Sequence, residues 1–100
     1  MPTLKERFEK ITNEVSGDYL RFERIGTKLS ERPDIHAMIL LDRLQPKPGH
    51  DIISAAEHDV FYLNIDADKL NEVITNDQVR ELARCGVHYD SDGDGLAMFA

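Results

Sequence analysis

Apolar residues at the start of the chain recur at intervals of four, three and four positions, which is the pattern of an amphipathic α-helix. Thr3, with Glu6 three residues later, has the spacing of a capping box at the beginning of this helix. Gly17 is placed to end it, because glycine readily adopts the backbone conformation that follows a helix. The apolar stripe of this first predicted helix consists of Leu4, Phe8, Ile11 and Val15.

The next segment predicts a second helix, which would begin after Asp18 and end at Pro33. Its apolar residues follow one another at intervals of three, three and four positions. Leu20 and Phe22 also alternate as in a β-strand, so a strand is the alternative for this segment. The residues that carry the helical pattern are Tyr19, Phe22, Ile25 and Leu29.

Longer apolar runs further along the chain indicate β-strands. Residues 35–44 are apolar at nearly every position, which favours a strand that is buried on both faces. A loop is predicted at residues 45–49, since they contain two prolines and a glycine. Residues 52–56 fit no single pattern, whereas residues 60–65 are rich in β-branched and aromatic side chains and predict a strand.

Two short helices and a hairpin are predicted for the last part of the chain. Asp66 can cap the first helix, and Thr75, followed three residues later by a glutamine, begins the second with a capping box. Gly86 is placed to end the second helix. Residues 87–89 and 96–99 flank a turn rich in Asp and Gly and predict a β-hairpin. The apolar residues of the two helices are Leu70, Val73, Ile74, Val79, Leu82 and Ala83.

These elements predict that residues 1–100 form a single domain of the α+β class, because the helices do not alternate regularly with the strands. We expect an antiparallel sheet of about four strands, on which the N-terminal helices and the short helix pair pack. The C-terminal β-hairpin would contribute two of these strands.

Charge is distributed unevenly along the chain, whose formal net charge is −7. Residues 51–100 contain eleven acidic and three basic residues, a net of −8, whereas residues 1–50 contain eight acidic and nine basic residues, a net of +1. A negative protein repels phosphate groups, so we expect no direct binding of nucleic acid, above all by the C-terminal half. A domain of 100 residues also has a thin core, which favours binding over catalysis.

The composition also indicates a compartment. Cys85 is the single cysteine, so no internal disulfide can form, which fits a reducing environment. The first residues are charged and lack the apolar run of a signal peptide. The longest strongly apolar run, residues 37–41, is far shorter than the roughly 20 residues that a membrane helix needs. We therefore expect a cytoplasmic protein without membrane attachment.

An acidic turn near the C-terminus resembles the beginning of a calcium-binding EF-hand loop. Asp90, Asp92 and Asp94 alternate and are followed by Gly95, as in the first six positions of that loop. The match ends there, because the twelfth position would be residue 101 and the chain stops at Ala100. The alternative is a solvated hairpin tip, where Asp and Gly tolerate the left-handed backbone conformation of tight turns.

Histidine and cysteine supply the other candidates for chemistry. His50, His58 and His88, together with a carboxylate, have the ligand types of a transition-metal site. Their spacings match no established motif, and histidines on the surface explain them more simply. Cys85 falls in the last turn of a predicted helix, where the dipole disfavours a thiolate, so a buried cysteine is predicted rather than a nucleophile.

Two helical features have alternatives of their own. The two short helices that follow Asp66 and Thr75 have the order of a DNA-reading helix-turn-helix, although their packing on the sheet explains them as well. The apolar stripe of the first helix offers a surface for a homodimer, although packing on the chain's own sheet is the default.

Residues 59–66 (DVFYLNID), 79–90 (VRELARCGVHYD) and 96–99 (LAMF) resemble segments of small uncharacterised proteins encoded by bacteriophages and prophages. The resemblance implies a compact accessory protein of a phage genome in a bacterial cytoplasm. It carries no catalytic signature, so it assigns no site.

We therefore expect the domain to act by binding another protein, without catalysis and without a cofactor. Its acidic half would present a negative surface that steers a basic partner and raises the association rate. The alternative is a metal-binding protein, with calcium at the turn of Asp90, Asp92 and Asp94 or a transition metal at the three histidines. The residues expected to bind the partner are Asp66, Asp68, Glu72, Asp90, Asp92 and Asp94.

Overall fold

The computed structural model describes residues 2–13, 19–57, 59–90 and 95–99, and its fold is α+β, as predicted. Helices and strands share one domain-sized unit, and none of the described helices is long and apolar enough to cross a membrane. The helices are α1 (Leu4–Thr12), the 3₁₀-helix η1 (Phe22–Arg24), α2 (Pro33–Leu44), α3 (Ala67–Val73) and α4 (Asn76–Arg84). The strands are β1 (Ile53–Glu57), β2 (Val60–Leu63), β3 (Val87–Asp90) and β4 (Gly95–Phe99).

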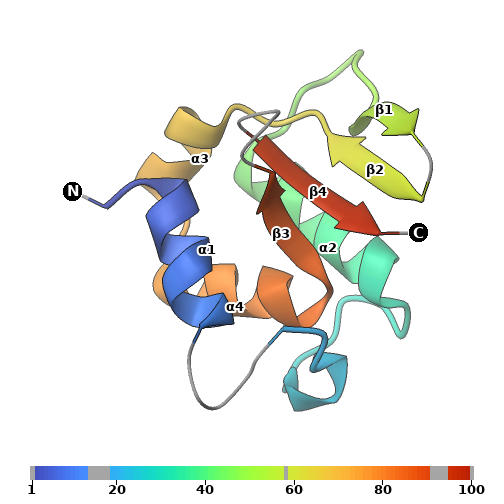
Figure 1. Ribbon diagram of the computed structural model, residues 1–100. Helices are drawn as coiled ribbons and strands as arrows, with labels where there is room; N and C mark the ends of the chain where they lie inside the picture. Colours follow the sequence, from blue (N-terminus) through green and yellow to red (C-terminus); the bar gives the residue numbers. More distant parts are fainter. Residues whose placement is uncertain (1, 14–18, 58, 91–94, 100) are drawn as a thin grey trace.

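The four strands form one antiparallel sheet in the order β1-β2-β4-β3 (Figure 1). The last strand is therefore an inner strand, in which Met98 pairs with Phe61 of β2 on one side and with Val87 of β3 on the other. The predicted C-terminal hairpin is confirmed, because β3 and β4 pair in antiparallel fashion. The acidic turn that joins them, residues 91–94, lies outside the described residues.

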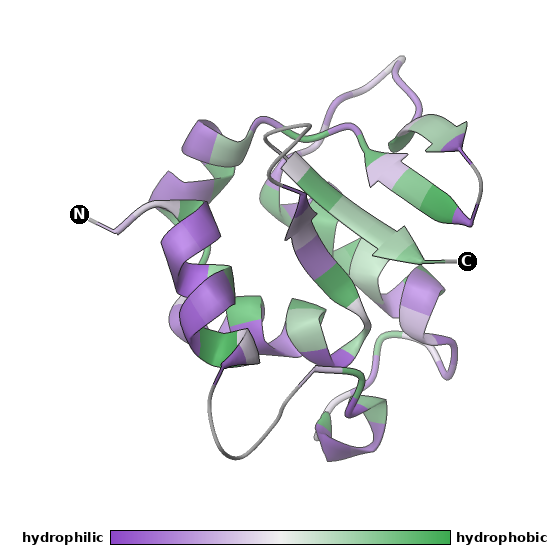
Figure 2. Cartoon of the chain, viewed as in Figure 1, coloured by the Kyte–Doolittle hydropathy of each residue, from purple (hydrophilic) through white to green (hydrophobic). Residues whose placement is uncertain are grey.

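One hydrophobic core lies between the helices and a single face of the sheet. In Figure 1, α2 lies behind the sheet, while α1, α3 and α4 gather beside β3. Figure 2 shows hydrophobic residues along β2 and β4 and hydrophilic residues over much of α1. The predicted stripe of α1 is buried at Leu4, Phe8 and Ile11, and Val15 lies outside the described residues. The largest fully buried apolar side chains are Phe8, Leu41, Leu70, Leu82, Leu96, Val79 and Val87.

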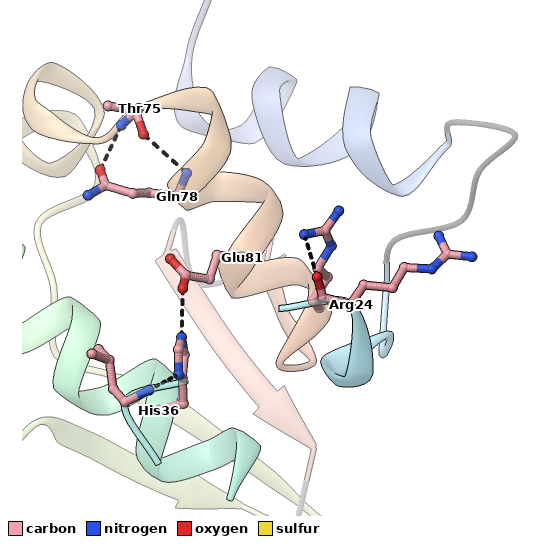
Figure 3. Close-up of polar contacts among 7 residues, drawn as sticks. Arg24, His36, Thr75, Gln78 and Glu81 are labelled. Atoms are coloured by element: carbon pink, nitrogen blue, oxygen red, sulfur yellow. Dashed lines mark hydrogen bonds and ion pairs between the residues drawn. The ribbon is translucent and has the colours of Figure 1, made fainter. Parts of the chain in front are cut away.

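The predicted N-caps Thr3, Asp66 and Thr75 are confirmed, although the Glu6 carboxylate accepts a hydrogen bond from the Thr3 hydroxyl instead of completing a capping box, and Gly17 lies outside the described residues. Thr3 and Asp66 each accept, through the side chain, a hydrogen bond from the backbone N–H three residues later. Thr75 and Gln78 form the complete capping box (Figure 3): the Gln78 N–H donates to Thr75 Oγ1 at 3.1 Å, and the Thr75 N–H donates to Gln78 Oε1 at 2.9 Å. Gly86 follows α4 with a φ of +96°, which glycine adopts without a steric penalty.

The strand predicted over residues 35–44 is wrong, because this segment is helix α2. Pro33, which was expected to end a helix, instead begins one, since the first helical residue does not need its N–H. The helical period was hidden because apolar residues also occupy positions outside the buried stripe. The stripe itself comprises His36, Ala37, Leu40 and Leu41. The remaining strand of the sheet is β1, from the segment that fitted no single pattern.

The helix predicted between Asp18 and Pro33 is also wrong, because the described part of this segment is helical only over the three residues of η1. Tertiary contacts hold the segment instead. The backbone N–H of Leu20 donates to the Ala83 carbonyl of α4 at 3.0 Å, and Ile25 is buried in the core. The local backbone bonds are those of one short turn, Arg24 N–H to the Arg21 carbonyl and Ile25 N–H to the Phe22 carbonyl, and the bond to α4 fixes the segment from outside.

A buried histidine joins α2 to α4. The side chain of His36 is fully buried, and its Nδ1 atom accepts the backbone N–H of Leu29 at 3.0 Å. Its Nε2 atom lies 3.0 Å from Glu81 Oε1 (Figure 3). Because Nδ1 accepts a hydrogen bond, the ring proton is on Nε2, and this N–H group donates a hydrogen bond to Glu81. The ring also packs edge-on against Phe22, with 5.8 Å between the ring centroids.

An arginine joins α1 to the turn between α3 and α4. The Arg7 guanidinium donates to the Asn71 carbonyl at 3.1 Å and to the Ile74 carbonyl at 2.8 Å, and both acceptors lie at the end of α3. It also donates to the side-chain oxygens of Asn71, at 2.7 Å, and Asn76, at 3.0 and 3.1 Å. One side chain therefore satisfies carbonyls that a helix end leaves without intrahelical partners.

Candidate functional site

The predicted acidic residues are only partly brought together. Asp66 and Asp68, at the beginning of α3, line a hollow of about 330 Å³ together with Tyr89 of β3. Asp90 follows Tyr89 directly, so these three carboxylates lie at the same end of the molecule. Lys5 lines the same hollow, which makes its charge mixed. Glu72 is exposed one turn further along α3, and Asp92 and Asp94 lie outside the described residues.

The candidate metal ligands are dispersed where they are described. His50 is exposed in the loop before β1, beside Lys47 and Asn64. His88 lies on β3 and stacks on Phe99. His58, Asp92 and Asp94 lie outside the described residues. Within the described part of the chain, no group of three or more His, Cys, Asp or Glu side chains is arranged to hold a metal ion, so the metal alternative stays a prediction.

Cys85 is buried, as predicted, with only 3% of its surface exposed. Burial, and to a lesser extent the carboxylate of Glu81, raise the pKa of the Cys85 thiol to about 12. The thiol therefore stays protonated near neutral pH, which leaves it without the thiolate that a nucleophile or a metal ligand requires.

The face of the sheet turned away from the core is open. Side chains alternate along a strand, so Val87 and Tyr89 of β3 point to the core, while His88 points to the opposite face. Of the described helices, none lies in front of β2 and β4 in the view of Figure 1. The pairing of Val60 with Phe99, and of Ala97 with both Tyr62 and His88, identifies the other residues on this side. We call it the open face, and it consists of Val60, Tyr62, His88, Ala97 and Phe99.

The open face is apolar and contains a large exposed aromatic ring. Phe99 is 61% exposed, although it belongs to an inner strand. Its ring stacks on that of His88, with 4.7 Å between the centroids and 21° between the planes. Ala97 is fully buried, because the larger side chains of Tyr62 and His88 flank it on the neighbouring strands. These contacts produce a continuous strip of rings and aliphatic groups across three strands.

Carboxylates border this strip. Glu57 pairs with Val60 at one edge, and Asp59 lies in the connection between β1 and β2. At the other edge, Asp90 lies on the same side of β3 as His88, by alternation. None of the four strands contains a lysine or an arginine. Between Lys47 and Lys69 the sequence contains five acidic residues and no lysine or arginine. The open face is thus apolar at its centre and negative at its edges.

A second hollow, of about 450 Å³, lies between α1 and α4 and is basic in character. Arg7, Lys10 and Arg80 line it together with Glu6. The guanidinium of Arg7 is already bonded to the end of α3, as described above, so it belongs to the framework of the fold.

The helix pair α3 and α4 is explained by packing. Helix α4 contacts α1, α2, η1 and β3, and its Val79, Leu82 and Ala83 are buried. One face of α4 therefore packs on the rest of the domain, and the DNA-reading alternative stays a prediction.

The open face was missed by reasoning from the sequence. A signal for it was present, because five of the six residues in the strand predicted at 60–65 are apolar or aromatic, and they occur in both alternating sets. Such a strand is either covered on both faces or exposes one apolar face, and the sequence does not distinguish these arrangements.

No family model, curated protein or solved structure matches the chain. The likeness to bacteriophage proteins stays a prediction.

Proposed function

We propose that this protein is a non-enzymatic binding module that holds a basic protein partner on the open face of its sheet. The observation that carries the proposal is the 61% exposure of Phe99, beside half-buried Val60, Tyr62 and His88, on a sheet face without a helical cover in the described residues. Exposed apolar patches with polar borders are typical of protein-binding sites.

Burial of this strip supplies the affinity. Covering apolar surface stabilises a complex by about 25 cal/mol for each Å² removed from water. Aromatic residues dominate the energy of many protein interfaces, because they bury a large area and lose little side-chain entropy. Phe99 is therefore the expected centre of the interface, with Tyr62 and Val60 beside it.

The charge of the surroundings selects the partner. Glu57, Asp59 and Asp90 border the strip, and none of the four strands contains a lysine or an arginine. Sheet faces that stack the bases of single-stranded nucleic acid combine aromatic rings with a positive groove for the backbone, and that groove is missing from these strands. A partner with lysines or arginines around an apolar anchor fits this surface.

The acidic residues predicted from the sequence act at longer range in this proposal. Asp66, Asp68 and Glu72 add to the negative potential at the end of the molecule that includes Asp90, and Asp92 and Asp94 add charge nearby in sequence. Their role is to steer the partner and raise its association rate, rather than to form the interface. The resemblance to phage proteins suggests that the module serves as an accessory protein of a phage genome.

A short synthetic peptide of alternating lysine and leucine is a suitable probe. We expect it to perturb the NMR signals of the open face, and the Phe99→Ser variant to weaken binding by about tenfold. Val73→Ser is the matched control, because Val73 is a similarly exposed apolar residue, at 55%, on α3. Equal losses in the two variants would contradict the proposal. So would an affinity that is flat between low and high salt, or equal binding of a control peptide of alternating glutamate and leucine.

A further inference from the structure

We propose that the partner docks by adding an extended strand to the free edge of β1. This inference rests on the proposed function and specifies the form of the partner: an extended basic segment that lengthens the sheet beside Tyr62. Contact with Phe99, which lies on β4, would come from the part of the partner that continues over the open face. Strand addition draws its affinity from backbone hydrogen bonds and its selectivity from alternate side chains.

Strand β1 is the free edge of the sheet. It stands at one end of the order β1-β2-β4-β3, and in Figure 1 no other described element lies beyond it. The opposite edge, β3, is packed by α1 and α4. Every β-strand at an edge has one row of backbone N–H and C=O groups turned away from its neighbour, so β1 presents that row to an incoming strand.

The side chains of β1 leave this edge accessible. Ser54, Ala55, Ala56 and Glu57 are all exposed, and three of the four are small. Natural sheets usually protect an edge with lysine, proline or an inward-pointing charge, and β1 contains neither lysine nor proline. A short strand and an irregular register between Ile53 and Ala55 limit the regular pairing to residues 55–57.

The neighbouring inner strand is incompletely covered, which points to a missing strand. Phe61 and Tyr62 of β2 are only half-buried, although β2 has a strand on each side. Their partners on β1 are Ala56 and Ala55, whose methyl groups cannot cover the rings. Strands lie about 4.8 Å apart, so longer side chains of an added strand can extend across the alanines on both faces. One face would then contact Phe61, and the other would contact Tyr62.

Charge favours a basic segment over a second copy of this chain at this edge. Asp51, Glu57 and Asp59 lie at the two ends of β1, so lysines or arginines of a partner would meet opposite charge. Antiparallel pairing of two β1 strands about Ala55 would bring Asp51, before the strand in one copy, near Glu57 and Asp59 at the end of the strand in the other. Like charges that face each other across strands are destabilising.

The decisive comparison uses the lysine–leucine peptide and a version of it with every backbone amide N-methylated. The two have the same charges and side chains, but the methylated peptide cannot donate backbone hydrogen bonds. We expect the first peptide to slow amide hydrogen exchange at residues 55–57 by about tenfold. The methylated peptide should bind at least about tenfold more weakly.

Two variants test the location. Ala56→Lys places a protective cation on the edge without disturbing a buried residue. We expect this variant to bind the lysine–leucine peptide about tenfold more weakly than the wild type does. Asn13→Lys adds the same charge at the end of α1, on the far side of the sheet in Figure 1, and should change the affinity less than about twofold.

The outcomes separate this inference from the proposed function. Equal binding of the two peptides, with the Phe99→Ser loss retained, would overturn strand addition and leave the open face as the binding site. Equal losses of affinity for the lysine–leucine peptide in Ala56→Lys and Asn13→Lys would also contradict strand addition at β1. If the lysine–leucine peptide does not bind even at millimolar concentration, both the binding site on the open face and the strand addition to β1 are wrong.

Discussion

At the scale of single residues, one carboxylate organises the contact between α2 and α4. Glu81 accepts a hydrogen bond from the Nε2–H group of fully buried His36. The charge of the Glu81 carboxylate also helps to raise the pKa of the Cys85 thiol. A buried imidazole needs partners for both nitrogens, and the backbone N–H of Leu29 supplies the second. With both ring nitrogens engaged, His36 is a structural residue, and the arrangement keeps the segment around Leu29 against the helical layer.

The raised pKa of Cys85 predicts a loss of stability at high pH. The folded thiol ionises near pH 12, whereas an unfolded cysteine ionises near its ordinary value of 9.0. The stabilisation is therefore complete below pH 9 and is lost as the pH rises toward 12. We expect the free energy of unfolding to fall by up to about 1.4 kcal/mol per pH unit in this window. Urea denaturation at pH 8, 9 and 10 measures this slope.

The control for that measurement is Cys85→Ala, which removes the titrating group. Its overall stability will differ, but its slope between pH 8 and 10 should be shallower than that of the wild type. Burial also raises the pKa of Tyr19 above its ordinary value of 10.0, so its contribution to the same trend begins at higher pH. Parallel slopes for the two proteins would show that Cys85 is not the group responsible.

At the scale of elements, Arg7 is expected to hold the helical layer together. The Arg7→Met variant keeps the aliphatic stem but leaves the carbonyls of Asn71 and Ile74 without their donor. We expect a loss of about 2 kcal/mol in the free energy of unfolding, since these bonds come from a charged donor and are partly buried. Thermal or urea unfolding measures the loss.

Lys10→Met is the matched control, because Lys10 lies on the same helix, carries the same charge and is exposed. It should change the free energy of unfolding by less than about 0.5 kcal/mol. A similar loss in both variants would assign the effect to net charge or helix propensity instead of the contacts of Arg7.

The elements that were predictable from the sequence are those whose signals are local. The caps at Thr3, Asp66 and Thr75 depend on residues three positions away, and all of them form as predicted. The run at residues 35–44 was assigned the wrong element because its apolar residues cover more than one face of a helix. A run without a clear period takes its structure from what packs around it, and the sequence alone does not contain that information.

The candidate site was harder to predict for the same reason. The acidic residues of the C-terminal half were evident, but only Asp66 and Asp68, at the beginning of α3, line one hollow, and Glu72 lies further along the helix. The exposure of Phe99 depends on which face of the sheet the helices cover, and that choice is made by tertiary packing. Sequence reasoning thus found the charge of the surface but not its apolar centre.

At the scale of the whole molecule, a net charge of −7 on 100 residues opposes self-association through the edges of the sheet. The free edge of β1 could otherwise pair with itself, since its central residues are small alanines. In the proposed function, charge at the two ends of the strand would protect against pairing of like chains and would attract a basic segment. The oligomeric state is a direct measure of that balance.

We expect the wild-type protein to scatter light as a monomer of 11.4 kDa at low salt. The Asp59→Lys variant would place a lysine near Asp51 of a second copy at both ends of an antiparallel β1 pair, and should therefore dimerise at least about tenfold more strongly. Glu9→Lys makes the same change of charge on an exposed position of α1 and should remain as monomeric as the wild type. A wild-type dimer at low salt would contradict the protective role of these charges. Equal association of the two variants would show that net charge, and not the end of β1, controls it.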